Sequence, residues 1–495
     1  MIRTRFAPSP TGFIHIGNLR TALFAYLIAK KNNGKFILRI EDTDRARSDT
    51  SFLKQIYSSL EMLGIDPDEG PANPGKYGPY IQSERIKIYK KYINRLVDKG
   101  LAYQCFCTPE ELQEKRKKHD NSKELPFMYD RSCRSLTENE IISNIKNKEA
   151  YVIRQKMPTR GSIKLRDMVF GEIEIENAQL DDQVLFKSDG YPTYNFANVV
   201  DDHLMDITHI VRGYEYLSST PKYLHLYDSL DWKAPETIHL PHIIHEDGKK
   251  ISKRMGDFSF SELTGSGYLP AAIVNYISLL GWNPGCDNEI FSVKELVNQF
   301  SPSRIKKSNA VFSLDKLNWF NKYYIQKMEF SEFHEKAIQF YSNDIFKKIS
   351  DLEYLSKIIK ERITTFSEIP KLSSFLISNE IKFNIYDFRG PKRKLSFPKC
   401  QSLLRTVLES LGKLSRWEKD ELYSNLKQTA VNENISFKDA AWTVRYALSG
   451  LRNSLGNATD LLYLLKEHES IVRIEKALSF LTQSKQDQKE ENMRP

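Results

Sequence analysis

Two short segments, far apart in the chain, contain residues whose types and spacing suit nucleotide chemistry. The first runs from Pro8 to Asn18 and closes with His15-Ile16-Gly17-Asn18. Glycine lacks a side chain, so a flat base can pack against its backbone, and histidine can donate a hydrogen bond to a phosphate oxygen. A helix that begins at this place would add free backbone N–H groups, which favour anions. A lone histidine here would more often only cap the helix.

The second segment is a turn rich in positive charge. Its cations, which fall within six residues next to Asp247-Gly248, are Lys249, Lys250, Lys253 and Arg254. A cationic loop that closes over a triphosphate would stabilise the negative charge that builds up on the departing pyrophosphate. Taken alone, such a turn is more often an exposed basic loop. The two segments together predict a site that grips one molecule of ATP from two sides.

The elements around the first segment should place it at the edge of a parallel sheet. Residues 2–6 read as a strand, and residues 7–14 as a loop rich in Pro, Ser, Thr and Gly. From Asn18 an apolar pattern at helical spacing continues to Asn33-Gly34, a helix stop, and residues 35–40 read as the next strand. This βαβ unit predicts an α/β Rossmann-type parallel-sheet catalytic domain, which binds ligands where strands end and helices begin.

The length and composition exclude several classes of protein. A chain of 495 residues is too long for one compact core, so several domains are expected. Lys plus Arg is 73 and Asp plus Glu is 64, and the net charge of +9 permits a polyanionic partner without requiring one. Five cysteines do not make a disulfide framework and favour a reducing, cytoplasmic compartment. No stretch approaches the roughly 20 apolar residues that span a bilayer, and no secretory leader is visible, so we expect no membrane partner.

Longer motifs make the prediction more specific. They read Arg5-Phe6-Ala7-Pro8-Ser9-Pro10-Thr11-Gly12, Leu38-Arg39-Ile40-Glu41-Asp42-Thr43-Asp44 and Ser188-Asp189-Gly190-Tyr191-Pro192-Thr193-Tyr194. Residues 15–18 and 250–254 resemble the HIGH and KMSKS signatures of class I aminoacyl-tRNA synthetases, with Asn18 at a position where that family tolerates small or polar residues. Together the motifs resemble the bacterial-type glutamyl-tRNA synthetases, and the resemblance runs from residue 2 through the final helices.

The resemblance implies a two-step ligase reaction. L-glutamate attacks the α-phosphate of ATP to give glutamyl-adenylate and pyrophosphate, and the terminal ribose hydroxyl of tRNA-Glu then takes the acyl group. Neither step needs a protein nucleophile, so catalysis would be positioning and charge stabilisation, with Mg²⁺ bridging the phosphates of the ATP substrate. The family also implies a monomer. Whether tRNA-Gln is charged as well stays open.

Carried over position by position, the family motif assigns a glutamate pocket. Its residues would be Arg5, Ala7, Ser9, Glu41, Tyr194, Asn198 and Arg212. The chemistry agrees, because two arginines suit a substrate with two carboxylates and Glu41 suits its ammonium group. An ion pair at the strand ends is the alternative interpretation of Arg5 and Glu41.

The ATP side is assigned in the same way. Nucleotide contacts would come from Pro8, His15, Gly17, Glu215, Ser252 and Lys253, and the catalytic group from His15, Gly17, Lys250 and Lys253. Lys253 is the first choice for the lysine that contacts phosphate, and Lys250 the second. Tyr216 stands where relatives can carry Trp, and an aromatic ring there keeps the ability to stack.

The domain order follows from the same resemblance. We expect the catalytic domain in residues 1–107 and 188–254, with an inserted α+β acceptor-stem-binding domain at 108–187. A helical stem-contact region would follow at 255–325, an all-α anticodon-binding domain at 326–481 and a disordered tail at 482–495.

In the helical region, Arg362 is a candidate for reading an anticodon base, because an arginine can pair with a base edge and stack on it. The basic loop of Arg389, Lys392, Arg393 and Lys394 could grip phosphates or simply be solvated. Trp442 and Tyr446 lie one helical turn apart, which favours core packing over base stacking.

Three cysteines raise the question of a metal. Cys105-Phe106-Cys107 precedes Tyr129 and Cys133, and some relatives bind zinc with this kind of pattern. Ser135 stands where a second late Cys or His would fall. Structural zinc normally takes four Cys or His ligands, whereas three thiolates with a phenol would be an unusual set. We therefore expect no zinc.

Three other functions fit parts of the sequence. A tRNA-modifying paralogue that glutamylates a base lacks a helical half such as residues 326–481. A glutaminyl-tRNA synthetase usually builds its anticodon region from β-barrels, and no series of short alternating strands occurs here. A catalytically silent RNA-binding protein on the same scaffold would be expected to have lost His15, Gly17 or Lys253.

Overall fold

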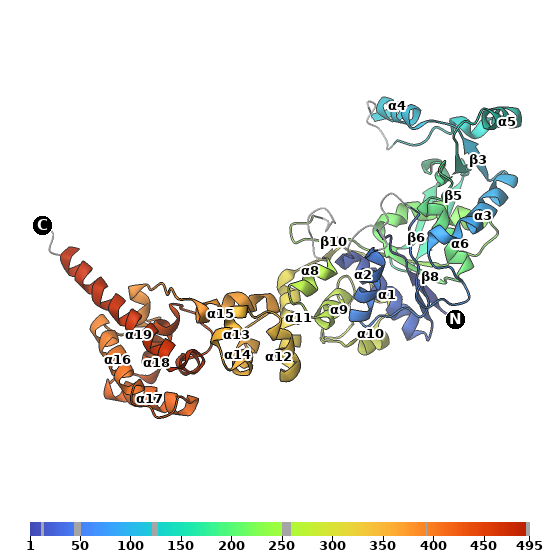
Figure 1. Cartoon of the computed structure of the whole chain (residues 1–495). Coiled ribbons are helices and arrows are strands. Elements are labelled where there is room, and N and C mark those ends of the chain that lie inside the picture. Colours follow the sequence, from blue (N-terminus) through green and yellow to red (C-terminus); the bar gives the residue numbers. More distant parts are fainter. Residues whose placement is uncertain (11–13, 44–50, 121–126, 250–258, 393, 492–495) are drawn as a thin grey trace. The chain divides into compact units, whose positions relative to one another are not determined.

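The computed structural model describes residues 1–10, 14–43, 51–120, 127–249, 259–392 and 394–491 (Figure 1). The chain divides into two compact units. The first contains residues 1–264 and 270–317, and the second contains residues 265–269 and 318–495. Within the described residues, no helix is long and apolar enough to cross a membrane.

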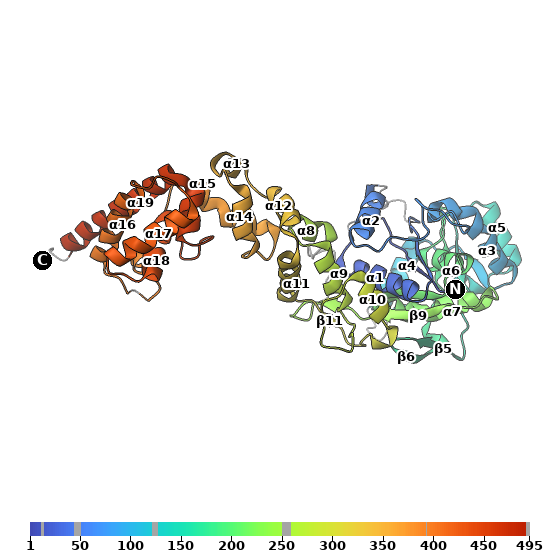
Figure 2. The same cartoon turned by 90° about the horizontal axis from the view of Figure 1, so that it is seen from below.

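A six-stranded sheet is the centre of the first unit. In order across the sheet its strands are β2 (Lys35–Leu38), β1 (Arg3–Phe6), β8 (His209–Gly213), β9 (Glu236–Leu240), β5 (Ser162–Asp167) and β6 (Gly171–Glu176). The first five run parallel, and β6 is antiparallel to β5 at the edge of the sheet (Figure 2). The predicted Rossmann-type parallel sheet is therefore confirmed.

Helix α1 (Ile16–Lys31) connects β1 to β2 and covers the sheet. Leu19, Leu23 and Leu27 are completely buried, because they repeat every four residues on one face. The helix ends at Lys31, close to the predicted stop at Asn33-Gly34, where Asn33 has a φ of 51°. A Cβ on Gly34 would lie 2.2 Å from the carbonyl oxygen of Ile2, so only glycine lets the chain enter β2 this close to β1.

Further helices flank this sheet in the first unit. They are α2 (Ser51–Met62), α3 (Ile86–Asp98), α6 (Tyr194–Leu204), α7 (Thr220–Ser229), α8 (Phe260–Gly265), α9 (Pro270–Ser278) and α10 (Val293–Gln299). Short 3₁₀ turns occur at Gln82–Arg85 (η1), Asn177–Gln179 (η3), Tyr214–Ser219 (η4) and Pro302–Arg304 (η6). A parallel pair, β10 (Ile243–Ile244) and β11 (Ala310–Val311), follows the central strands.

The region expected as an insertion at 108–187 is divided between two sheets. Strand β3 (Ala102–Cys105) pairs with β4 (Val152–Gln155), and β4 with β7 (Val184–Phe186), in an antiparallel sheet that begins before residue 108. Helices α4 (Pro109–Asp120) and α5 (Glu138–Lys146) and the turn η2 (Ser132–Ser135) accompany it. Strands β5 and β6 instead join the central sheet, so the pairing of strands differs from the expected boundaries.

The second unit is helical throughout its described residues. Helix α11 (Leu314–Lys327) leads into α12 (Phe330–Ile338), α13 (Asn343–Lys348), α14 (Leu352–Lys360), α15 (Ile369–Ile377), α16 (Phe397–Leu411), α17 (Lys419–Asn432), α18 (Phe437–Ser449) and α19 (Ala458–Glu491), with 3₁₀ turns η7 (Phe366–Glu368) and η8 (Ile385–Arg389). The division between the units falls after Leu317, not after the expected residue 325.

Helix α19 is interrupted at Lys466, where φ is 63° and ψ is 176°, and then continues to Glu491. Residues 482–491, for which the sequence suggests a disordered tail, are therefore helical. Their Lys, Gln and Glu residues are good helix formers, which favours propagation of the preceding helix into them.

Candidate active site

A cavity of about 320 Å³ opens where β1, β8 and β9 end and where α1 begins. Parallel sheets bind ligands at this edge, because strand ends and helix N-termini meet there. Ten of the residues predicted for the site line this cavity: Arg5, Ala7, Pro8, Ser9, His15, Gly17, Glu41, Tyr194, Arg212 and Glu215. Asn198 does not line it. Lys250, Ser252, Lys253, Arg254 and Arg393 lie outside the described residues.

His15 occupies the N-cap of α1. Its Nδ1 accepts a hydrogen bond of 3.1 Å from the backbone N–H of Gly17, so the capping role that the sequence suggests as the simpler alternative is present. A Cβ at position 17 would lie 2.9 Å from the imidazole Cε1, so glycine is required for the ring to lie over the first turn. Because Nδ1 accepts this hydrogen bond, a neutral ring carries its proton on Nε2.

Ser259 and Phe260, which follow the cationic segment in the sequence, are tied to this cap. Ser259 pairs with His15 in an antiparallel bridge, and the backbone N–H of Phe260 donates to the carbonyl of Ile14 at 3.0 Å. The carbonyl of Lys249 accepts a hydrogen bond of 2.8 Å from the backbone N–H of His245. The bridge to His15 places Ser259 next to a residue that lines the cavity.

Arg5 belongs to a buried network of charges. Its Nε and Nη2 donate to the carboxylate of Asp202 at 3.0 and 3.3 Å, and its Nη1 donates to the carbonyl of Val211. Burial alone would lower the pKa of Arg5, but the attraction of Asp202 holds it above its usual value. Arg39 donates to the same carboxylate at 2.7 Å. In place of a strand-end ion pair between Arg5 and Glu41, the alternative interpretation of these two residues, Arg5 pairs with Asp202 and Glu41 pairs with Arg39.

Glu41 completes that network on the side of the cavity. Its Oε1 accepts a hydrogen bond of 3.0 Å from Nη2 of Arg39. Burial raises the pKa of Glu41 to about 7, against the opposing pull of Arg39 and Arg5. A cationic ligand group placed beside this carboxylate would restore its ionised form.

Arg212, at the end of β8, lacks a carboxylate partner within the described part of the chain. Only 5% of the residue is exposed, yet its Nε donates to Nε2 of His239 at 3.1 Å and its Nη2 to Oγ1 of Thr220 at 2.8 Å. Its guanidinium carbon also lies 4.8 Å from the ring centre of Tyr223. A buried guanidinium that lines a cavity and is hydrogen-bonded only to neutral groups is suited to receive an anionic group.

The remaining pocket residues come from α6 and the turn that follows β8. Burial raises the pKa of Tyr194 well above its usual value, so its phenol stays neutral. The side-chain amide of Asn198 donates to the carbonyl of Tyr194 at 2.8 Å and faces a small neighbouring cavity shared with Arg212. The rings of Tyr194 and Tyr216 lie 5.4 Å apart, which makes one wall of the site aromatic.

Sequence reasoning missed several residues that shape the cavity. Arg20 of α1 lies buried beside it and donates to the carbonyls of Pro241 and Leu280, and burial lowers its pKa to about 10. Asp202 and His239 were missed as well. A signal for Asp202 exists, because an acid inside an apolar helical stretch needs a buried cation as its partner.

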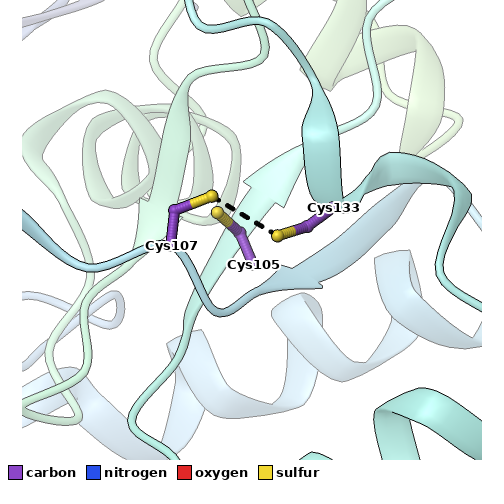
Figure 3. Close-up of side chains that lie close together, drawn as sticks. All are labelled: Cys105, Cys107 and Cys133. Carbon is purple, nitrogen blue, oxygen red and sulfur yellow. Dashed lines mark hydrogen bonds between the residues drawn. The ribbon is translucent and has the colours of Figure 1, made fainter. Parts of the chain in front are cut away.

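The three cysteines gather in the first unit. Figure 3 shows the sulfur atoms of Cys105, Cys107 and Cys133 turned toward one another, and they lie within 4.8 Å. Cys105 and Cys107 also contact the phenol of Tyr129, at 3.2 and 3.6 Å. Burial raises the pKa of Tyr129, which makes its phenol a poor anionic ligand. The described residues add no fourth Cys or His to the cluster.

In the second unit, the predicted RNA-reading residue Arg362 is exposed at the end of α14. Burial, followed by the proximity of Arg362, lowers the pKa of Arg445. The guanidinium of Arg445 lies 4.5 Å over the ring of Trp442. Tyr446 is packed in the core and accepts a hydrogen bond from the backbone N–H of Asn384, as its spacing predicts.

The comparisons with known proteins agree with this architecture. The family model for class I tRNA synthetases (E and Q), catalytic domain, matches residues 1–319, and the model for an anticodon binding domain matches residues 332–478. A glutamate–tRNA ligase of Clostridium novyi (strain NT) is 46% identical over 96% of both chains. A glutamate–tRNA ligase of Clostridium acetobutylicum is 45% identical over 96% of this chain and 97% of its own.

Solved structures give the same result. A glutamate tRNA ligase from Elizabethkingia meningosepticum, in complex with its amino acid, has a TM-score of 0.84 and 35% identity, and covers 97% of this chain and 99% of its own. A glutamate–tRNA synthetase from Elizabethkingia anophelis has a TM-score of 0.85 and 33% identity over the same shares of the two chains. The matches in sequence and fold extend over both units, so the chain belongs to the glutamate–tRNA ligases among the class I tRNA synthetases.

Proposed function

We propose that the cavity at the start of α1 joins L-glutamate to ATP and then passes the glutamyl group to the 3′-terminal adenosine of tRNA-Glu. One observation carries the proposal: a single cavity is lined both by the His15–Gly17 cap and by Arg212 with Glu41. The first pair suits a nucleotide phosphate, and the second pair suits a zwitterion with an additional carboxylate. Membership of the glutamate–tRNA ligases supports the same reaction.

Different pocket residues hold different groups of the substrate glutamate. Glu41 takes the substrate ammonium, and Arg212 supplies the charge for a carboxylate. Arg5 already pairs with Asp202, so its contribution to the pocket is to hold the network that carries Glu41. The site thereby orients one substrate carboxylate toward the α-phosphate of ATP, where it attacks without any protein nucleophile.

The nucleotide is held by backbone N–H groups and by side chains that donate hydrogen bonds or carry positive charge. The first turn of α1 offers its N–H groups to phosphate, and Nε2 of His15 donates a further hydrogen bond. Mg²⁺ enters as part of the nucleotide substrate and neutralises phosphate charge when bound. Pro8 and Glu215 contact the nucleoside, and Ser252, Lys250 and Lys253 act on the departing pyrophosphate. Lys253 is six residues before Ser259, which pairs with His15.

The domain roles are proposals as well. Residues 108–187 would bind the acceptor stem, 255–325 contact the tRNA stem and 326–481 read the anticodon, with Arg362 in direct contact with a base. The match of residues 332–478 to an anticodon binding domain supports the last of these. We further propose that the protein acts as a monomer in the cytoplasm, without zinc.

The role of Lys253 is tested by comparing two lysines of the same segment. Lys253→Ala should lower the rate of ATP–pyrophosphate exchange, measured with and without tRNA, by the roughly 2.7–4 kcal/mol typical of a lost oxyanion contact. Lys249→Ala is the matched control, because Lys249 is exposed and pairs with Asp247 at 2.9 Å. Equal rates for the two variants would refute the assignment of Lys253.

The reaction itself is tested by aminoacylation with labelled glutamate. Purified tRNA-Glu and tRNA-Gln are supplied separately with ATP and Mg²⁺. We expect label at the 3′ end of tRNA-Glu, and the second reaction reports whether tRNA-Gln is accepted too. Labelling of neither tRNA, by a protein whose fold is intact, would contradict the proposed function.

A further inference from the structure

We propose that Asp167 and His239 form a buried positioning pair that orients the guanidinium of Arg212 and so determines the selection of glutamate. The pair never touches the cavity itself. The inference rests on the proposed function, because it assigns to Arg212 a carboxylate of the substrate.

The pair and Arg212 are placed by three neighbouring strands. Arg212 in β8 and His239 in β9 stand directly opposite each other in the parallel register. Asp167 ends β5, the next strand, and its Oδ2 lies 2.7 Å from Nδ1 of His239. The three residues are 5%, 0% and 2% exposed, respectively. Because all three sit in the sheet, their relative positions are fixed by backbone hydrogen bonds and not by mobile loops.

The hydrogen bonds define the state of the imidazole. Arginine has donors only, so Nε2 of His239 must accept the hydrogen bond of 3.1 Å from Nε of Arg212. The ring proton therefore resides on Nδ1 and points to Asp167. Burial lowers the pKa of His239, in accord with a neutral ring. A doubly protonated ring would place one N–H against another and push Arg212 away.

Asp167 is saturated with hydrogen bonds. Its Oδ1 accepts from the backbone N–H groups of Val169 and Phe170, both at 2.9 Å. Its Oδ2 accepts from the backbone N–H of His239 at 3.1 Å and from the imidazole. The carboxylate can therefore hold the ring in one orientation only. The imidazole stands between the carboxylate and Arg212, so the arginine is oriented without being neutralised by a direct ion pair.

Thr220 supports the other side of the guanidinium. Its Oγ1 accepts from Nη2 of Arg212 at 2.8 Å and lies 2.9 Å from the carbonyl of Tyr216, to which it can donate. Nε and Nη2 are thus held by neutral acceptors. Nη1 makes no hydrogen bond within the described structure, and Arg212 lines the cavity.

This arrangement explains how an arginine can discriminate between two similar substrates. A guanidinium offers only N–H donors, which match the two acceptor oxygens of a carboxylate. The carboxamide of glutamine has an NH₂ group in place of one of these oxygens. This group would face the N–H donors of Arg212 unless the arginine rotated away from it. Fixing Nε and Nη2 from behind removes that rotation, so the pair should favour glutamate over glutamine.

The test compares His239→Leu with His239→Gln in the full-length enzyme. Leucine removes the acceptor for Arg212, whereas glutamine keeps one acceptor and one donor. We expect His239→Leu to raise the KM for glutamate by about tenfold to a hundredfold, the effect of a lost hydrogen bond to a charged group. Its preference for glutamate over glutamine should fall. The values of kcat and of KM for ATP and tRNA-Glu should stay within about threefold of wild type, since the proposed function assigns Arg212 to glutamate alone. His239→Gln should recover most of the loss.

Thr220→Val provides a second, milder variant in case His239→Leu does not fold. It removes the hydroxyl that accepts from Nη2 and should raise only the KM for glutamate, by about threefold to tenfold. An unchanged KM for glutamate in a folded variant, or a parallel rise of all three KM values, would overturn the positioning role. Failure of the wild-type enzyme to charge tRNA-Glu would instead overturn the proposed function, so the two failures are distinct.

Discussion

Two buried arginines at the ends of neighbouring strands, Arg5 in β1 and Arg212 in β8, have opposite surroundings. Arg5 donates to Asp202 inside a network that also contains Arg39 and Glu41, so its charge is neutralised within the protein. Arg212 is held by an imidazole and a hydroxyl, which fix its direction and leave its charge available. Residue type alone does not distinguish an arginine suited to a structural role from one suited to binding an anion. The charge of the groups that accept its hydrogen bonds makes the distinction.

The different surroundings of Arg5 and Arg212 predict different effects on stability when either side chain is removed. Removing one partner from a buried ion pair leaves the other charge buried and unpaired, which is strongly unfavourable. Removing a buried cation whose hydrogen-bond partners are neutral leaves no such unpaired charge behind. The Arg5 region should therefore govern stability, and the Arg212 region should govern affinity for glutamate.

Arg5→Met gives the largest expected effect. The variant leaves Asp202 with Arg39 as its remaining close cation, and the free energy of unfolding should fall by about 3–5 kcal/mol. Urea denaturation measures the loss. If the variant is as stable as the wild type, Arg5 is not the structural member of the two.

Arg212→Met should leave stability within about 1 kcal/mol of wild type, because no carboxylate loses its partner, and should weaken glutamate binding by about 2–5 kcal/mol. The KM for glutamate in aminoacylation measures the second effect, and urea denaturation the first. If Arg212→Met instead strongly lowered the free energy of unfolding and left the KM for glutamate unchanged, Arg212 would be the structural arginine.

The pH dependence of glutamate binding sharpens the role of Glu41. Its pKa of about 7 means that the carboxyl is increasingly protonated below pH 7 and cannot pair with an ammonium group. The proton must leave when glutamate binds, so the Kd should rise as pH falls, by about tenfold per pH unit well below 7. Calorimetric titration with L-glutamate between pH 5.5 and 8 measures this slope.

Glu41→Gln is the control for that titration, because the amide does not ionise. Its Kd for L-glutamate should be larger than that of the wild type at pH 8 and nearly constant between pH 5.5 and 8. A wild-type Kd that does not change with pH would show that Glu41 is not the group that meets the ammonium.

Tyr223→Phe should have the smallest effect. The ring 4.8 Å from the guanidinium carbon of Arg212 is kept, so the KM for glutamate should change by less than about twofold. The hydrogen bond of 2.7 Å from its hydroxyl to Asn195 is lost, which should lower stability by about 1 kcal/mol. A large rise in KM would mean that the hydroxyl, and not the ring, acts on Arg212.

The parts of the site that the sequence predicts are those with local signals. The helix that follows β1 was predictable from apolar spacing and from Asn33-Gly34, and its start placed His15 and Gly17 at the N-terminus. The resemblance to a known family pointed to Arg5, Glu41 and Arg212, and these residues do line one cavity. Lys250 and Lys253 stay predictions.

Long-range pairings gave no comparable signal. Asp202 and Arg5 are separated by 197 positions, and His239 and Asp167 by 72, so no periodicity or motif connects them. The return of β5 and β6 to the central sheet was missed for the same reason, because the pairing of strands depends on distant partners. Local patterns identify elements, and only the folded sheet shows which charges meet.

The pairing of Ser259 with His15 has a consequence for how this chain can vary. Ser259 pairs with the residue that caps α1, and the next residue, Phe260, donates its backbone N–H to the carbonyl of Ile14. A substitution that displaces the backbone at Ser259 would also disturb this cap, because the two residues share the bridge. Exchanges at position 259 should therefore reach the cavity indirectly, through His15, which lines it.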